Sequence, residues 1–187
     1  MSEQAPRVLL LPGWQNSGPG HWQSCWEAEF GDLRVQQADW MQPLRGDWIC
    51  QLEQAVLAQT APLLLAAHSL GCHLAAAWSA VSRHRDRVAG ALLVAAPDLC
   101  RPDLPPALHS WRGHPLQRLP FPAHLVSSSN DPYCSPQAAR ALARSWGCQH
   151  SELEDRGHIN ADSGLGDWPQ GRAWLQQLPL HPEARTR

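Results

Sequence analysis

One stretch of this chain, residues 63–71, constrains its fold more than any other. It reads Leu-Leu-Leu-Ala-Ala-His-Ser-Leu-Gly, an apolar run of strand length that ends in a serine and leads straight into a helix-like segment. Such a strand-to-helix turn lifts a hydroxyl above the end of a sheet and brings two backbones so close that the flanking positions must be small. Ala67 and Gly71 meet this requirement, although alanine stands where glycine is usual. The stretch predicts an exposed nucleophile, Ser69.

Composition and charge limit the partners that the chain can have. Its 187 residues, 43% hydrophobic and 17% charged, predict one domain over 1–187, with a core over about 7–178 and a polar tail over 179–187. A net charge of −2 gives no electrostatic footprint for nucleic acid or for an anionic membrane. All basic residues are arginine, which excludes lysine Schiff-base chemistry. No signal-peptide or membrane-spanning pattern is present, so we expect a cytoplasmic protein.

The cysteines and histidines do not predict a metal centre. The six cysteines form no closely spaced pair, so we expect free, mostly buried thiols. His68, Cys72 and His73 come nearest to a ligand set, but they lie within the predicted turn around Ser69. We therefore expect neither a metal nor an organic cofactor.

Strand-like and helix-like segments alternate along most of the chain, which predicts a mainly parallel, three-layer α/β sheet. The expected strands are 8–11, 33–36, 63–67, 88–96, 124–128 and 148–153. The expected helices are 21–30, 47–59 with Asp47 as N-cap, 71–84, 136–147 with Ser135 as N-cap, and 168–178. Residues 97–123 interrupt the alternation with seven prolines, which forbid a long helix. This segment either covers part of a pocket or is a solvated loop, and the sequence leaves both open.

A serine hydroxyl needs a base to take its proton, and the base needs an acid to orient it. On a sheet of this kind the chain order is serine, acid, histidine, each at the carboxyl end of a strand. Asp131 follows the strand 124–128 and is the predicted acid, with Asp98 as its rival after the strand 88–96. His158, preceded by glycine in the loop after the last strand, is the predicted base.

The same turn predicts how a negatively charged oxygen would be held. The backbone N–H of Leu70, the residue after the serine, is one expected oxyanion-hole donor. The other is the N–H of Trp14, where Pro12-Gly13 lets the backbone after the first strand approach a substrate. Ten tryptophans are many for this length, and four of them are candidates either to line an apolar pocket or to pack in the core: Trp14, Trp22, Trp40 and Trp111.

Several short motifs, spread from about residue 7 to residue 178, resemble one known group of proteins. They are Leu11-Pro-Gly-Trp-Gln-Asn-Ser-Gly-Pro-Gly-His-Trp22, Asp39-Trp40 with Pro43, Ala67-His-Ser-Leu-Gly-Cys72, Asn130-Asp-Pro-Tyr133, Gly157-His-Ile-Asn, Ser163-Gly and Trp168-Pro. The chain is similar to the retinoblastoma-binding-protein-nine-like small serine hydrolases of the α/β-hydrolase superfamily. The resemblance implies an α/β-hydrolase fold without a large lid domain and a triad at Ser69, Asp131 and His158. It implies no settled substrate, and we carry no retinoblastoma-type partner across.

These patterns predict a serine hydrolase that cleaves a small ester or amide through an acyl-enzyme, with no nucleic acid or membrane as partner. Two alternatives remain. A protein-binding module on the same fold is suggested by the proline-rich segment 97–123, although nothing in the sequence supports a particular protein partner. A flavodoxin-like nucleotide binder would share the alternation, but residues 13–20 lack the glycine spacing of a phosphate-binding loop.

Overall fold

The computed structural model describes residues 5–113 and 116–179. Its centre is a parallel sheet of six strands in the order β2-β1-β3-β4-β5-β6. The strands are β1 Arg7–Leu11, β2 Leu33–Arg34, β3 Leu63–His68, β4 Val88–Val94, β5 Ala123–Ser128 and β6 Gln149–Leu153. The predicted parallel α/β sheet is confirmed.

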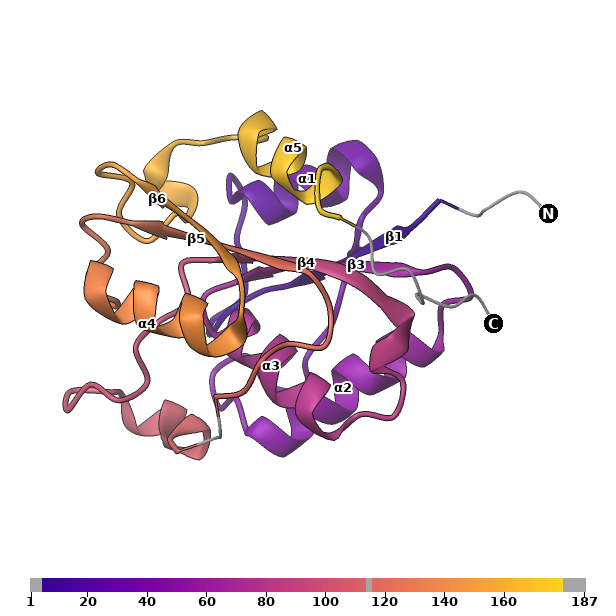
Figure 1. Ribbon diagram of the computed structural model, residues 1–187, viewed down its shortest axis with the longest axis horizontal. Coiled ribbons are helices and arrows are strands. Elements are labelled where there is room, and N and C mark those ends of the chain that lie inside the picture. The colour runs from indigo at the N-terminus through magenta and orange to yellow at the C-terminus, as the bar shows by residue number, and fades with distance from the viewer. Residues whose placement is uncertain (1–4, 114–115, 180–187) are drawn as a thin grey trace.

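Helices cover both faces of this sheet, giving three layers (Figure 1). The helices are α1 Trp22–Phe30, α2 Arg45–Leu57, α3 Leu70–Val81, α4 Pro136–Trp146 and α5 Pro169–Gln176. One face carries α1 and α5, and the other carries α2, α3 and α4. No large lid domain covers the sheet in the described part of the chain.

The central strands β3 and β4 are almost entirely apolar because each of their faces is buried against a helical layer. Successive side chains of a strand point to opposite faces, and the two hydrophobic clusters follow this alternation. Leu9 and Leu65 belong to the cluster on the side of α2, α3 and α4, whereas Leu10 and Leu64 belong to the cluster on the side of α1 and α5. The uninterrupted apolar runs in the sequence are thus the signature of two cores.

The helix ends show which local signals the chain uses. Ser135 caps α4 as predicted, since its side chain accepts a hydrogen bond from the N–H of Ala138, and Gly147 ends that helix in the left-handed region. The prediction for Asp47 was wrong. The N-cap of helix α2 is Leu44, three residues earlier, and Asp47 lies in the first turn. There a carboxylate still stabilises the helix by interacting with the helix dipole.

The proline-rich segment contains no α-helix over its described residues 97–113 and 116–123, as predicted. Its most regular part is one short 3-10 helix, η2, over Pro106–Trp111. The expected polar tail, apart from residue 179, lies outside the described residues. Over those residues, no helix is both long and apolar enough to cross a membrane. The six cysteines are free thiols, but only two of them are buried.

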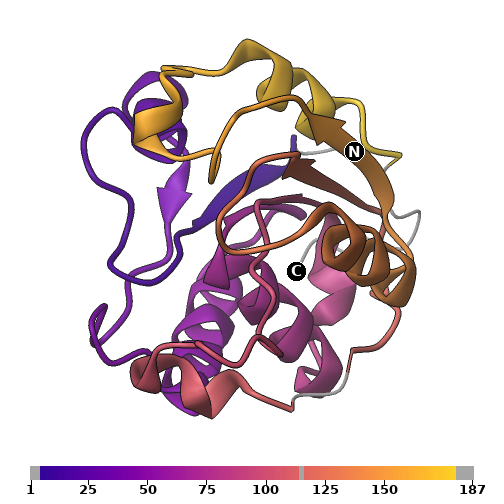
Figure 2. The same cartoon turned by 90° about the vertical axis from the view of Figure 1, so that its left-hand side faces the viewer.

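Because all six strands are parallel, their carboxyl ends meet at one edge, which Figure 2 shows facing the viewer. The loops after β1, β3, β4, β5 and β6 all emerge there. Ligands of open parallel sheets bind in crevices at this edge. It is therefore the place to look for a functional site.

Candidate active site

Ser69 sits on the strained turn between β3 and α3. Its backbone has φ 54° and ψ −123°, a conformation that residues other than glycine rarely adopt. The turn is held from both sides: the N–H of Ser69 donates to the carbonyl of Val94 at 2.8 Å, and its own carbonyl accepts from the N–H of Cys72 at 3.0 Å. Backbone strain of this kind persists only where surrounding contacts fix it, and it is typical of active sites.

Two glycines make the turn possible. A Cβ atom at Gly71 would lie 2.1 Å from the carbonyl oxygen of Leu11, so any side chain there would push α3 away from β1. A Cβ atom at Gly13 would lie 2.7 Å from the Cβ of Ser69. The requirement for a small residue at position 71, predicted from sequence, is confirmed. The buried Ala67 shows that one methyl group fits on the strand side.

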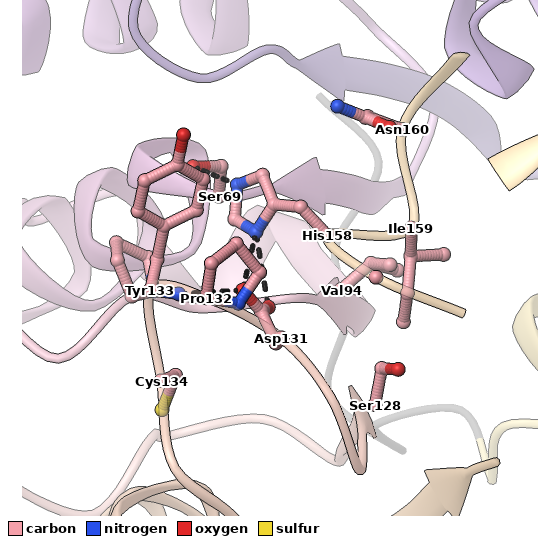
Figure 3. Close-up of polar contacts among 12 residues, drawn as sticks. Ser69, Val94, Ser128, Asp131, Pro132, Tyr133, Cys134, His158, Ile159 and Asn160 are labelled. Atoms are coloured by element: carbon pink, nitrogen blue, oxygen red, sulfur yellow. Dashed lines mark hydrogen bonds and ion pairs between the residues drawn. The ribbon is translucent and has the colours of Figure 1, made fainter. Parts of the chain in front are cut away.

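The side chains of Ser69, His158 and Asp131 meet in one hydrogen-bonded line (Figure 3). The Nε2 atom of His158 lies 2.9 Å from the Oγ of Ser69, and its Nδ1 atom lies 3.0 and 3.1 Å from the two carboxylate oxygens of Asp131. Since a carboxylate only accepts hydrogen bonds, Nδ1 carries the proton and Nε2 is free to accept one from the serine. The sequence predicted these three residues, and the fold brings them together.

Asp131 is the carboxylate that faces the histidine, and its rival Asp98 does not. The Asp131 side chain is 1% exposed, and its Oδ1 also accepts a hydrogen bond from the N–H of Tyr133 at 2.9 Å. Asp98 instead accepts from the N–H of Cys100 and lines a separate cavity. The Tyr133 ring packs edge-on against the imidazole of His158, with centroids 4.6 Å apart.

The loops that carry Asp131 and His158 are tied to each other by small polar side chains. The Oδ1 of Asn130 accepts from the N–H of Gly157 at 2.7 Å and from the hydroxyl of Ser128 at 3.0 Å. The Oγ of Ser128 in turn accepts from the N–H of Arg156 at 2.9 Å. These bonds hold the histidine loop at a fixed distance from the acid. These bonds were not predicted from the sequence, although the polar run over residues 127–131, which begins within β5, was a possible signal.

His68, which precedes the serine, also contacts the histidine loop. Its Nε2–H donates to the backbone carbonyl of His158 at 2.9 Å, and the two rings lie 4.9 Å apart. Burial, followed by the nearby His21, lowers the pKa of His68 well below its usual range, so the ring is neutral. From the sequence His68 was interpreted as a pocket-wall or packing residue. It does line the pocket, but its bond to His158 was not foreseen.

A second neutral histidine, His21, caps α1. Its Nδ1 accepts a hydrogen bond from the N–H of Gln23 at 3.1 Å, which leaves the proton on Nε2. Burial, with a smaller contribution from the charge of Arg34, lowers the pKa of His21 to about 3. The ring centroid of His21 lies 4.5 Å from that of His68. Two uncharged imidazoles therefore flank the triad residues.

Ser69 and His158 open into a pocket of about 500 Å³, within the usual range for small-molecule sites. We call one side the N-terminal wall, residues 14–21, and the other side the proline-rich wall, residues 97–108. The proline-rich segment thus forms part of a pocket and is not only a solvated loop. The described lining residues of the two walls are Trp14, Gln15, Asn16, Gly18, His21, Pro97, Arg101, Asp103, Leu104, Pro105 and Leu108.

Of the four candidate tryptophans, only Trp14 lines the pocket. The pocket interpretation was wrong for the other three. Trp22 and Trp111 are almost completely buried in the two hydrophobic cores, and Trp40 packs against one of them. A tryptophan has enough apolar surface to serve either purpose, so the sequence could not separate the two.

The two backbone groups expected to form an oxyanion hole lie at the pocket beside Ser69. Trp14 and Leu70 both line it. Across residues 5–113 and 116–179, no backbone carbonyl accepts a hydrogen bond from either N–H group outside the regular helices and strands. Leu70 is also the first residue of α3, where N–H groups lack an intrahelical partner and the helix dipole favours negative charge.

Comparison with solved structures agrees with this architecture. A protein described as a YdeN-like hydrolase from Pectobacterium atrosepticum is 27% identical, with a TM-score of 0.80, over 92% of this chain and 90% of that one. The ydeN gene product of Bacillus subtilis is 20% identical, with a TM-score of 0.74, over 92% and 97%. Est1E from Butyrivibrio proteoclasticus is 11% identical, with a TM-score of 0.71, over 94% and 90%.

No curated protein sequence matches the chain. The narrower resemblance to the retinoblastoma-binding-protein-nine-like group is not confirmed by these comparisons and stays a prediction. A family model, described as serine hydrolase, matches residues 8–177, nearly the whole described chain. The chain therefore belongs to the serine hydrolase family.

Proposed function

We propose that the protein hydrolyses small esters or amides, with Ser69 as nucleophile, His158 as general base and acid, and Asp131 as the residue that orients His158. One observation carries the proposal: a hydroxyl on a strained turn, open to a pocket, is hydrogen-bonded to an imidazole whose far nitrogen faces a buried carboxylate. This arrangement has the geometry and the roles of an acyl-transfer triad.

In the proposed first step, the Oγ of Ser69 bonds to the substrate carbonyl carbon while its proton moves to the Nε2 of His158. Asp131 stabilises the resulting imidazolium. The negatively charged oxygen of the tetrahedral intermediate accepts hydrogen bonds from the N–H groups of Leu70 and Trp14. When the intermediate collapses, the bond to the leaving group breaks and His158 gives that group its proton, which leaves an acyl-enzyme.

The second step repeats the first with water as the nucleophile. His158 takes a proton from water, and the hydroxide adds to the acyl carbon. The bond to the Oγ of Ser69 then breaks, the serine recovers its proton from His158, and a carboxylic acid is released. The overall reaction therefore consumes only the substrate and one water molecule. Ester substrates make the simpler test because their leaving group is less basic than an amine.

Covalent labelling tests the proposal directly. A fluorescent fluorophosphonate should label the wild-type protein, and peptide mapping should place the adduct on Ser69. The Ser69→Ala variant should not be labelled, whereas the Ser145→Ala variant, altered at an exposed serine of α4, should label like the wild type. Labelling that persists in Ser69→Ala would place the nucleophile elsewhere. A protein that neither labels nor cleaves any p-nitrophenyl ester, yet captures a specific protein, would favour the binding-module alternative.

A further inference from the structure

We propose that this pocket selects esters with an uncharged acyl group, because the only formal charges on its described lining, Arg101 and Asp103, neutralise each other. The inference rests on the proposed function and adds to it the class of substrate. It also assigns a role in specificity to an ion pair that lies outside the triad.

The pair on the proline-rich wall is closed by two parallel hydrogen bonds. The Nε and Nη2 atoms of Arg101 lie 2.6 and 2.5 Å from the two carboxylate oxygens of Asp103. This bidentate geometry is the strong form of the arginine–carboxylate interaction. It satisfies both charges within the wall, so neither is left to attract a charged substrate.

Two buried histidines at the pocket add no charge to it. His21 and His68 are both held neutral by burial, as described above. The carboxylate of Asp131 is almost completely buried behind His158 and does not line the pocket. In the proposed mechanism this carboxylate stabilises the imidazolium that forms on His158 during the reaction.

Apart from uncharged polar side chains such as Asn16 and Asn160, the remaining lining offers hydrocarbon and no counterion for a charged acyl chain. Leu104, Pro105 and Leu108 line the pocket from the proline-rich wall, and Leu70 and Trp14 line it near the serine. An ionised group placed among such side chains loses its water without gaining a counterion, which is costly. An uncharged chain instead gains from burial of its apolar surface.

Arg101 also contacts residues other than Asp103, so the effect of removing the Asp103 charge can be tested while the guanidinium stays in place. Its Nη1 donates to the carbonyl of Pro132 at 2.9 Å, and its guanidinium lies over the Tyr133 ring, 5.8 Å from the centroid. Asp103, by contrast, has a 64% exposed side chain whose hydrogen bonds go to Arg101. The Asp103→Asn variant should therefore leave the guanidinium in place at the pocket, with its positive charge uncompensated.

The experiment compares three p-nitrophenyl esters with six-carbon acyl chains: hexanoate, the monoester of adipate, which ends in a carboxylate, and 6-aminohexanoate, which ends in an ammonium group. All three release the same chromophore. For the wild type, kcat/KM for hexanoate should exceed that for each charged ester at least about tenfold. In Asp103→Asn, kcat/KM for the adipate ester should rise about three- to tenfold relative to hexanoate, because the free guanidinium attracts a carboxylate. The value for 6-aminohexanoate should not rise.

The matched control is Asp47→Asn. It makes the same change of charge at an exposed position of α2 that does not line the pocket. It should keep the wild-type order of the three esters. The inference is overturned if the wild type cleaves a charged ester as well as hexanoate, or if Asp103→Asn and Asp47→Asn show the same charge selectivity. An enzyme that cleaves none of the three and resists the fluorophosphonate overturns the proposed function, and this inference with it. Active protein without charge selection overturns the inference alone.

Discussion

The two walls of the pocket are built in different ways. The N-terminal wall is anchored by Arg34, whose side chain is only 8% exposed and whose five N–H donors are all used. They reach the side chains of Asn16, Ser24 and Glu27 and the carbonyl of Ser17. The proline-rich wall is anchored by Arg101, which is 27% exposed and bonds to Asp103 and to the Pro132 carbonyl.

This difference matches what each wall has to do in the proposed reaction. Trp14, the expected oxyanion donor, belongs to the N-terminal wall, where a small displacement would weaken binding of the transition state. Buried and fully paired polar groups hold backbone in one position because any movement leaves a donor or acceptor unsatisfied. In the proposed reaction, the proline-rich wall would contact the part of the substrate that does not react, and its partly exposed ion pair could vary without disturbing the chemistry. The fully paired anchor therefore belongs to the wall that carries the expected oxyanion donor.

The largest effect is expected at Gly13. In Gly13→Ala the new methyl group would lie 2.7 Å from the Cβ and 3.1 Å from the Oγ of Ser69, so the N-terminal wall must move away from the serine. We expect kcat/KM for p-nitrophenyl hexanoate to fall about 100-fold, the order of magnitude for loss of one oxyanion donor. Gly46→Ala, where a Cβ atom would meet nothing within 4 Å, is the control and should retain activity. Near-normal turnover by Gly13→Ala would show that this wall tolerates displacement.

Arg34→Lys tests the anchor of the same wall. Lysine keeps the positive charge but cannot reproduce the planar fork of donors, so several partly buried acceptors lose their partners. We expect the free energy of unfolding to fall by about 2 kcal/mol and kcat to fall about tenfold. Urea denaturation and steady-state kinetics measure the two effects.

Asp103→Asn provides the corresponding change in the proline-rich wall. Because this carboxylate is mostly exposed, its loss should leave the urea midpoint close to that of the wild type. If Asp103→Asn destabilised the protein as much as Arg34→Lys, the contrast between the two anchors would be wrong.

The last prediction concerns the protonation of His21. It has almost no effect on stability at neutral pH and becomes measurable as the pH falls. Its folded pKa, about 3, lies below the value of 6.5 for the unfolded chain, so below pH 6.5 the unfolded state binds more protons than the folded state. Stability should therefore decrease as the pH falls from 6.5 towards 3, by up to about 1.4 kcal/mol per pH unit for this one group. His68, whose pKa is also lowered, acts in the same direction.

The variant His21→Asn isolates this contribution, because asparagine can still cap α1 but does not titrate. Urea midpoints measured between pH 7 and pH 4 should fall less steeply for His21→Asn than for the wild type. Equal slopes would mean that the histidine of the N-terminal wall is protonated as easily in the folded protein as in the unfolded chain.

Much of the fold and the triad geometry could be predicted from local patterns. Apolar runs without polar interruption identified strands covered on both faces, and the chain order of Ser69, Asp131 and His158 followed from where those strands end. Helix ends were predicted less accurately. The N-cap of α2 was assigned to Asp47, although the helix begins after Leu44, which makes no side-chain cap. Packing of α2 on α3 and the sheet can form a helix end without a cap residue.

By itself, the sequence determined the α/β alternation, the turn at Ser69 and the need for a small residue at position 71, because these depend on neighbouring residues and on strand and helix periodicity. Only the tertiary structure decided which tryptophans reach the pocket, that His68 bonds to His158, and that Arg34 and Arg101 anchor opposite walls. Those contacts join residues far apart in the chain, or depend on how a loop returns to the sheet. Local sequence patterns carry no information about contacts of this kind. The contacts form only when the helical layers pack on the sheet.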